Sequence, residues 1–134
     1  MSTTRQVIVV RKDLNMRKGK IASQAAHASM AFLSKIYMTS PSGVDIFPLI
    51  FKTAISEVEL EWLRDSFTKI CLYVNSEDEL MEIFHAAEVA GLVVNLITDN
   101  GTTEFGGIPT KTCLAIGPDY KERIDPITKH LKLL

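Results

Sequence analysis

The chain has 134 residues, enough for one ordinary domain, and its composition (46% hydrophobic, 23% charged) is that of a globular protein with a real core. No stretch reaches the roughly 18 consecutive apolar residues of a membrane span, and the first residues carry no apolar signal core. We therefore expect one domain over residues 1–134, located in the cytoplasm.

Basic and acidic residues are unevenly distributed beneath a net charge of −1. Residues 1–37 carry seven basic side chains and one acidic one, residues 38–110 carry three and twelve, and residues 111–134 carry five and three. This segregation predicts a cationic face that binds a polyanion, with an acidic face turned away. The alternative is that charges clustered in the sequence are scattered in space.

The two cysteines, Cys71 and Cys113, lie in apolar runs typical of strands. We interpret them as reduced, buried small hydrophobes rather than a disulfide or a pair of metal ligands. The sequence has no CxxC, no HExxH and no His/Cys cluster, so we expect neither a metal site nor a cofactor.

The chain begins with a predicted strand over residues 6–11, because Val7–Val10 is a continuous β-branched run that suits a strand buried on both faces. A helix is expected from about Lys18 to Tyr37, where apolar residues recur at helical spacing. Arg17, Lys18 and Lys20 lie where the basic turn opens this helix. Basic side chains and free N–H groups at a helix start predict a site for an anion, although the GxxxxGK[ST] spacing of a P-loop is absent.

Further along, the predicted elements alternate between helices and strands. Residues 38–56 are the least regular, and the apolar patch from Ile46 to Phe51 has no clear assignment. The remaining expected elements are helix 56–67 with a Ser56/Glu59 capping box, strand 69–74, a helix from a second capping box at Ser76 to Gly91, strand 92–98, strand 112–116, a last helix ended by Pro126, and a packed tail.

This alternation predicts an α/β protein with three layers, α/β/α, around a small and mostly parallel sheet. The third strand runs directly into a polar, glycine-rich loop that begins with Asp99-Asn100-Gly101-Thr102-Thr103. Active sites in such sheets lie beyond the carboxyl ends of strands. If the first and third strands point the same way, the Arg11–Lys20 turn and this loop share one edge.

Three segments together resemble the type-II peptidyl-tRNA hydrolases, the archaeal and eukaryotic kind. They are the motif Lys-Gly-Lys-Ile-Ala-Ser-Gln-Ala-Ala-His-Ala (residues 18–28), the loop at residues 99–103, and the ending His-Leu-Lys-Leu-Leu (residues 130–134). The resemblance covers nearly the whole chain. It implies a mixed four-stranded sheet and metal-independent hydrolysis of the ester that joins a peptide to the 3′ ribose of tRNA.

The resemblance also implies the residues of the site. Lys20, Asp99 and Thr103 would form the catalytic group. Lys20 would stabilise the oxyanion or clamp a phosphate, Asp99 would position water, and Thr103 would bond the water or Asp99. The residues expected to bind substrate are Arg17, Lys18, Gln24, His27 and Thr112. Because no nucleophile-elbow motif is present and neither cysteine is placed as a nucleophile, water is the expected attacking group.

Each assignment has a structural alternative. Lys20 is simply a lysine at a helix start, where the dipole disfavours a cation. Asp99 suits an Asx turn with Asn100-Gly101, and an aspartate with an ordinary pKa of about 3.9 is a weak base at neutral pH. We interpret His27 as a positioning residue rather than a proton carrier, and Trp62 as a packing residue unless it is exposed and stacks on a base.

The chain departs from the usual loop of this family, Asp-Ala-Gly-Arg-Thr-Gln, at Asn100, Thr102 and Glu104, and the segment 39–55 is longer. Loss of the arginine and gain of Glu104 remove positive charge beside the site. They motivate a second hypothesis, a non-catalytic RNA-binding or protein-interaction domain that keeps the fold. The oligomeric state stays open, with the helix near Trp62 offering a face for a homodimer.

Overall fold

Strand β1 (Thr4–Arg11) lies at the centre of the sheet and explains the layering of the molecule. The computed structural model describes residues 3–39 and 47–134. Along β1, Val7 and Val9 pack into one hydrophobic cluster, and Ile8 and Val10 pack into another on the opposite face. The β-branched run is therefore buried on both faces, as its composition predicts.

The sheet has five strands in the order β3-β4-β1-β2-β5. They are β1, β2 (Lys69–Val74), β3 (Val94–Asp99), β4 (Thr110–Tyr120) and the short β5 (Lys132–Leu133). Among the pairings of the described strands, only that of β1 with β2 is parallel. Both β1 and β3 pair antiparallel with β4, so β1, β2 and β3 all point the same way. The first and third strands point the same way, which the meeting of the two loops requires. The prediction of a mostly parallel sheet is wrong, because three of the four described pairings are antiparallel.

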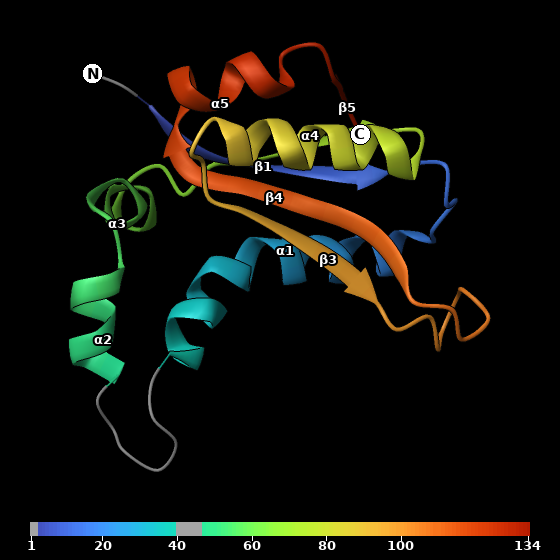
Figure 1. Ribbon diagram of the computed structural model, residues 1–134, viewed down its shortest axis with the longest axis horizontal. Coiled ribbons are helices and arrows are strands. Elements are labelled where there is room, and N and C mark those ends of the chain that lie inside the picture. The colour runs from blue at the N-terminus through green and yellow to red at the C-terminus, as the bar shows by residue number, and fades with distance from the viewer. Residues whose placement is uncertain (1–2, 40–46) are drawn as a thin grey trace.

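Helices cover both faces of the sheet (Figure 1). On one face lie α4 (Glu77–Val89) and α5 (Lys121–Thr128), whose Leu80, Ile83, Ala87 and Ile124 fill the first cluster. On the other lie α1 (Lys18–Met38) and α3 (Glu57–Arg64), with α2 (Phe47–Ala54) contacting α1. The three-layer α/β/α class is confirmed.

Local signals account for several helix ends. Ser56 and Glu59 form a complete capping box at α3. At α4, Ser76 Oγ accepts from Glu79 N at 3.0 Å, and Gly91 ends the helix in the left-handed region with φ of +75°.

Trp62 is 1% exposed, donates its indole N–H to Thr68 O at 2.8 Å, and packs edge-on against Phe32. It is a packing residue, and it has no exposed face for stacking on a base.

Four details differ from the prediction. The tail adds β5 to the edge of β2, which makes five strands rather than four. Strand β4 continues through residues 117–119, where a helix approach was expected, because after a shift in register at residues 117–118 Asp119 and Tyr120 pair again with β1. Pro126 lies inside α5, which continues to Thr128, so it does not end that helix. Residues 47–54, within the unassigned segment, form α2, and residues 40–46 of that segment lie outside the described residues.

Candidate active site

The carboxyl ends of β1 and β3 lie at the same edge of the sheet, because both strands run antiparallel to β4. The turn after β1 leads into α1, and the loop after β3 returns into β4. The two predicted segments, 11–20 and 99–103, therefore meet at one edge. This is the arrangement that the sequence argument required.

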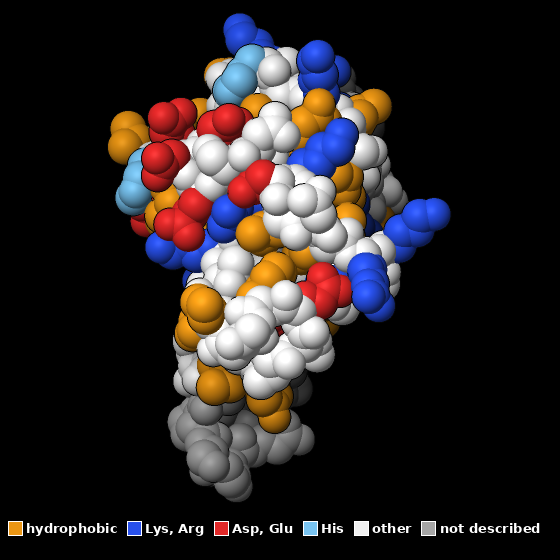
Figure 2. All heavy atoms as spheres, turned by 90° about the vertical axis from the view of Figure 1, so that its right-hand side faces the viewer, with side chains coloured by type: hydrophobic (Ala, Val, Ile, Leu, Met, Phe, Trp, Pro, Cys, Tyr) orange, Lys and Arg blue, Asp and Glu red, His pale blue; other side chains and the backbone are white. Residues whose placement is uncertain are grey.

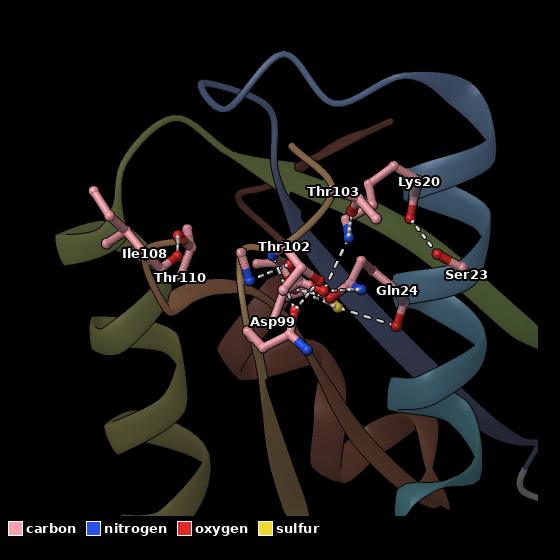
Figure 3. A network of polar contacts seen from close by, with 12 residues as sticks. Lys20, Ser23, Gln24, Asp99, Thr102, Thr103, Ile108 and Thr110 are labelled. Carbon is pink, nitrogen blue, oxygen red and sulfur yellow. Dashed lines mark hydrogen bonds and ion pairs between the residues drawn. The ribbon is translucent and has the colours of Figure 1, made fainter. Parts of the chain in front are cut away.

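Lys20 and Asp99 are in direct contact at this edge (Figure 3). Lys20 Nζ donates to Asp99 Oδ1 at 2.9 Å and to Thr103 Oγ1 at 2.6 Å. The side chains of Lys20 and Asp99 are each 12% exposed. The ammonium thus turns away from the start of α1 towards a carboxylate and a hydroxyl, which offsets its unfavourable place at the positive end of the helix.

The second oxygen of Asp99 is held by the backbone. Gly101 N donates to Asp99 Oδ2 at 2.9 Å, which is the Asx turn that the structural alternative foresaw. The two interpretations of Asp99 are therefore compatible, because one oxygen fixes the turn and the other faces Lys20. Gly101 has φ of +83°, and a Cβ there would lie 2.2 Å from Ile108 O. The loop closes on itself at this glycine, which only a residue without a side chain allows.

Gln24 and Thr112 form a buried support beneath the pair. Gln24 Nε2 donates to Asp99 Oδ1 at 3.2 Å, and Thr112 Oγ1 donates to Gln24 Oε1. Gln24 is 2% exposed and Thr112 is fully buried. Cys113 Sγ donates to the Gln24 carbonyl at 3.3 Å. A chain of bonds thus runs from β4 through α1 to Asp99, and Gln24 and Thr112 act on the site from beneath it.

Hydrogen bonding sets the charge state of Asp99. The bonds from Lys20 and then from Gly101 lower the pKa of the Asp99 carboxyl, and desolvation only partly opposes them. Asp99 is therefore ionised at neutral pH and is a weak base. Burial raises the pKa of the Cys113 thiol to about 11, so this cysteine is neutral at pH 7 and is not an activated nucleophile.

The remaining predicted substrate-binding residues are exposed around this pair. Arg17 precedes α1 and caps no N–H group with its side chain, and the first turn of α1 holds no acidic residue. With Asn15, Thr103 and Glu104 it lines a hollow of about 540 Å³ beside the pair. Lys18 is exposed at the first position of α1, and His27 is exposed further along the helix.

Sequence reasoning missed Phe105. Its half-buried ring packs against the cluster on the α1 face and lies 5.8 Å from Lys20 Nζ, near enough for a cation–π contact. The signal was available, because a single aromatic residue within a polar, glycine-rich loop calls for a packing partner.

A second group of charges occupies the same edge. Arg11 is paired with Asp13 at 2.7 Å and with Glu77 at 3.7 Å, and Lys111 lies 3.9 Å from Glu77. Viewed at this end, acidic side chains gather on one side of the surface with basic side chains beside and across from them (Figure 2). Charges that are segregated in the sequence are therefore partly interleaved in space.

Within residues 3–39 and 47–134, no group of three His, Cys, Asp or Glu side chains is arranged to hold a metal ion. Cys71 and Cys113 are free thiols on β2 and β4, with β1 between them. In the same part of the chain, no helix is both long enough and apolar enough to cross a membrane.

Comparisons with known proteins agree along the chain. A family model described as peptidyl-tRNA hydrolase PTH2 matches residues 4–134. A peptidyl-tRNA hydrolase from Methanothermobacter thermautotrophicus is 42% identical over 130 residues, covering 97% of this chain and 99% of that protein. One from Methanocaldococcus jannaschii is 38% identical, with the same coverage. A probable peptidyl-tRNA hydrolase 2 from Dictyostelium discoideum is 37% identical over 96% of this chain and 54% of its own length.

Among solved structures, a protein of unknown function from Agrobacterium tumefaciens strain C58 superposes with a TM-score of 0.57 at 11% identity. The match covers 100% of this chain and 99% of that one. At this identity the likeness shows a shared fold alone.

Proposed function

The chain belongs to the peptidyl-tRNA hydrolase PTH2 family, and from this premise we propose how its Lys20–Asp99 pair hydrolyses the ester between a peptide and tRNA. The observation that carries the proposal is the contact of the Lys20 ammonium with both Asp99 and Thr103. A cation, a carboxylate and a hydroxyl within bonding distance are what an ester needs in order to be attacked by water.

Asp99 orients the attacking water. Its Oδ1 already accepts from Lys20 and Gln24, whereas Gly101 N is the one donor to Oδ2 among the described residues. Because a carboxylate oxygen has two lone pairs, Oδ2 retains one for a proton of water. The low pKa of the carboxyl makes Asp99 an orienting group rather than a strong base.

Lys20 stabilises the charge that develops on the substrate. Water adds to the ester carbonyl carbon, the carbonyl oxygen becomes an oxyanion beside the ammonium, and collapse breaks the bond to the ribose 3′ oxygen. That oxygen leaves with a proton that originates from the water. Thr103 accepts a bond from Lys20 and, as a hydroxyl, can donate another to the water or the oxyanion.

The other residues bind or position. Gln24 and Thr112 are positioning residues, since both are buried and reach the reaction through Asp99. Arg17 and Lys18 bind phosphates of the acceptor end, and His27 positions the substrate. This binding weakens steeply as salt concentration rises, because each neutralised phosphate releases counterions.

The reaction takes place in the cytoplasm, where translation supplies peptidyl-tRNA. A homodimer stays a prediction, which gel filtration tests.

The test is deacylation of a labelled N-blocked aminoacyl-tRNA by wild type, Asp99→Ala and Lys20→Ala. We expect kcat to fall about 10²- to 10³-fold in each variant, the size of effect seen when one oxyanion donor is removed. Circular dichroism shows whether the variants stay folded. Activity that survives both substitutions overturns the mechanism. Tight tRNA binding by wild type without release of the amino acid favours the rival hypothesis of a non-catalytic RNA-binding domain.

A further inference from the structure

Strand β3 is an edge strand that ends on the catalytic carboxylate. It pairs with β4 on one side, and no strand in the described part of the chain pairs with its other side. Its last residue is Asp99. Alternate backbone N–H and C=O groups of an edge strand are available to an added strand. The outer edge of β3, where an added strand could pair, therefore leads directly to Asp99.

A furrow runs between β3 and α1 beside this edge. It has a volume of about 520 Å³ and is lined by His27, Met30, Ala31 and Lys35 of α1 and by Asn95 and Ile97 of β3. Asn95, Ile97 and Asp99 alternate along one strand and so face the same side, towards α1. On α1, His27 follows Gln24 by one turn. The walls of the furrow thus belong to the same two elements that carry Gln24 and Asp99, and Figure 3 shows β3 and α1 side by side at these two residues.

Asn95, one of the residues that line the furrow, carries an acceptor without a partner in the described structure. Asn95 is 3% exposed, and its Oδ1 is buried without a hydrogen-bond partner in the described structure. A buried amide oxygen without a partner is costly, and a backbone N–H brought into the furrow would satisfy it. A second hollow beyond Asn95 shares Lys35 and Asn95 with the furrow, so the path continues towards the start of β3.

We propose that the peptide of peptidyl-tRNA lies extended in this furrow and pairs with the outer edge of β3 as an added strand. The inference rests on the proposed function of Lys20 and Asp99. The ester end of the peptide, its C-terminus, lies at Asp99, so the peptide runs parallel to β3. Main-chain pairing gives affinity that does not depend on side chains, which suits a substrate whose peptide sequence varies.

The lining favours a peptide over nucleic acid. Among the six lining residues named above, His27 and Lys35 are the only basic ones, and Met30, Ala31 and Ile97 are apolar. An RNA backbone needs a series of cations to follow its phosphates. At about 3.3 Å per residue, a peptide of roughly five residues matches the length of β3.

A series of substrates tests the proposal directly. N-acetylated peptidyl-tRNAs with one, three and five residues are compared with a five-residue peptide whose backbone nitrogens are methylated at alternate positions, in both frames. We expect kcat/KM to rise about tenfold from one to five residues, as two added main-chain hydrogen bonds would give. The gain appears in KM, and methylation in one of the two frames abolishes it.

Two variants test the furrow from the side of the protein. Ala31→Phe fills the furrow from α1, and Ala86→Phe makes the same change at an exposed position on α4, across the sheet. We expect Ala31→Phe to lose the dependence on peptide length while hydrolysing the one-residue substrate like wild type. Ala86→Phe keeps the length dependence. Thermal melting confirms that both variants fold.

The outcomes separate the two proposals. If wild type hydrolyses none of the three substrates, the proposed function fails. If they are hydrolysed but kcat/KM does not change with peptide length, or if neither methylation frame lowers it, the peptide does not pair with β3 and the inference is overturned. A loss in Ala31→Phe that is equal for all lengths likewise contradicts it.

Discussion

Two groups of charges at one edge of the sheet use the same residue types with different results. The inner pair, Lys20 and Asp99, is 2.9 Å apart with both side chains 12% exposed. The outer cluster, Arg11, Asp13, Glu77 and Lys111, contains one tight contact at 2.7 Å and two at 3.7 and 3.9 Å, with the Glu77 side chain 50% exposed.

The difference lies in what holds each carboxylate. Asp99 accepts from an ammonium, a buried amide and a backbone N–H, so its position is set from three directions. Glu77 approaches two cations, Arg11 at 3.7 Å and Lys111 at 3.9 Å, and exposed pairs of this kind contribute little free energy. Preorganisation, rather than the presence of opposite charges, distinguishes a candidate catalytic pair from a solvated surface cluster.

Among the variants that test this comparison, the largest effect is expected from a change in the loop that donates its backbone N–H to Asp99. In Gly101→Ala the new Cβ would overlap Ile108 O and the residue would keep a left-handed φ. We expect stability to fall by about 1–3 kcal/mol and kcat/KM by at least about tenfold, because the loop that orients Asp99 shifts. Urea denaturation and deacylation kinetics measure the two effects.

Gly106→Ala is the matched control. Gly106 also has a left-handed φ, of +60°, but a Cβ there meets no atom within 4 Å. We expect it to lose about 1 kcal/mol of stability from backbone strain and to keep its activity. Equal losses of activity in the two variants would show that backbone strain in the loop, and not the position of the Asp99 carboxylate, governs the rate.

The charge state of Asp99 gives a second way to sharpen the comparison. Its pKa is lowered in the folded protein, so the ionised form adds stability above the unfolded-state pKa of about 3.9, and this stability is lost as pH falls through the folded-state pKa. We expect Asp99→Asn to be less stable than wild type at pH 6. The difference in free energy of unfolding begins to shrink below about pH 4, where the carboxyl of the unfolded wild type takes up a proton, and it is lost once the pH falls below the lowered folded-state pKa.

Denaturant titrations of both proteins at several pH values measure this difference. Asp13→Asn is the control, because Asp13 belongs to the outer cluster and its side chain is 30% exposed. A stability difference for Asp99→Asn that stays constant between pH 6 and pH 3 would mean that the Lys20 contact does not stabilise the ionised form.

The sequence predicted the elements and the meeting of the two loops, because periodicity, capping residues and a buried β-branched run are local signals. The capping box of Ser56 and Glu59 stabilises a helix end only a few residues away, and so does the left-handed Gly91. The local pattern gave the wrong role for Pro126, because α5 continues past this residue although proline has no backbone N–H to donate. Strand β5 has only two residues and exists through its pairing with Leu72 and Tyr73, a contact that no local pattern contains.

The candidate site likewise has a part that the sequence predicted and a part that it did not. Lys20, Asp99, Gln24 and Thr112 could all be named from the sequence, but as substrate-binding residues in the case of the last two, and their contact with each other could not be foreseen. The bond from Thr112 to Gln24 joins residues 88 positions apart. Because Thr112 lies in a buried strand and Gln24 on a helix face, the sequence indicates two separate polar residues, and only the packing of α1 on β4 makes one a positioning partner of the other.

The smallest effect is expected in the outer cluster, from Glu77→Gln. Glu77 makes only long contacts and begins α4, where a negative charge is favoured by up to about 0.5 kcal/mol. Stability should therefore fall by no more than about 0.5 kcal/mol, and deacylation should change less than about twofold at 0.15 M salt. At low salt tRNA affinity should rise slightly, since one anion near Arg11 and Lys111 is removed. A loss of activity comparable to that of Asp99→Ala would place the outer cluster in the site and erase the distinction between the two groups of charges.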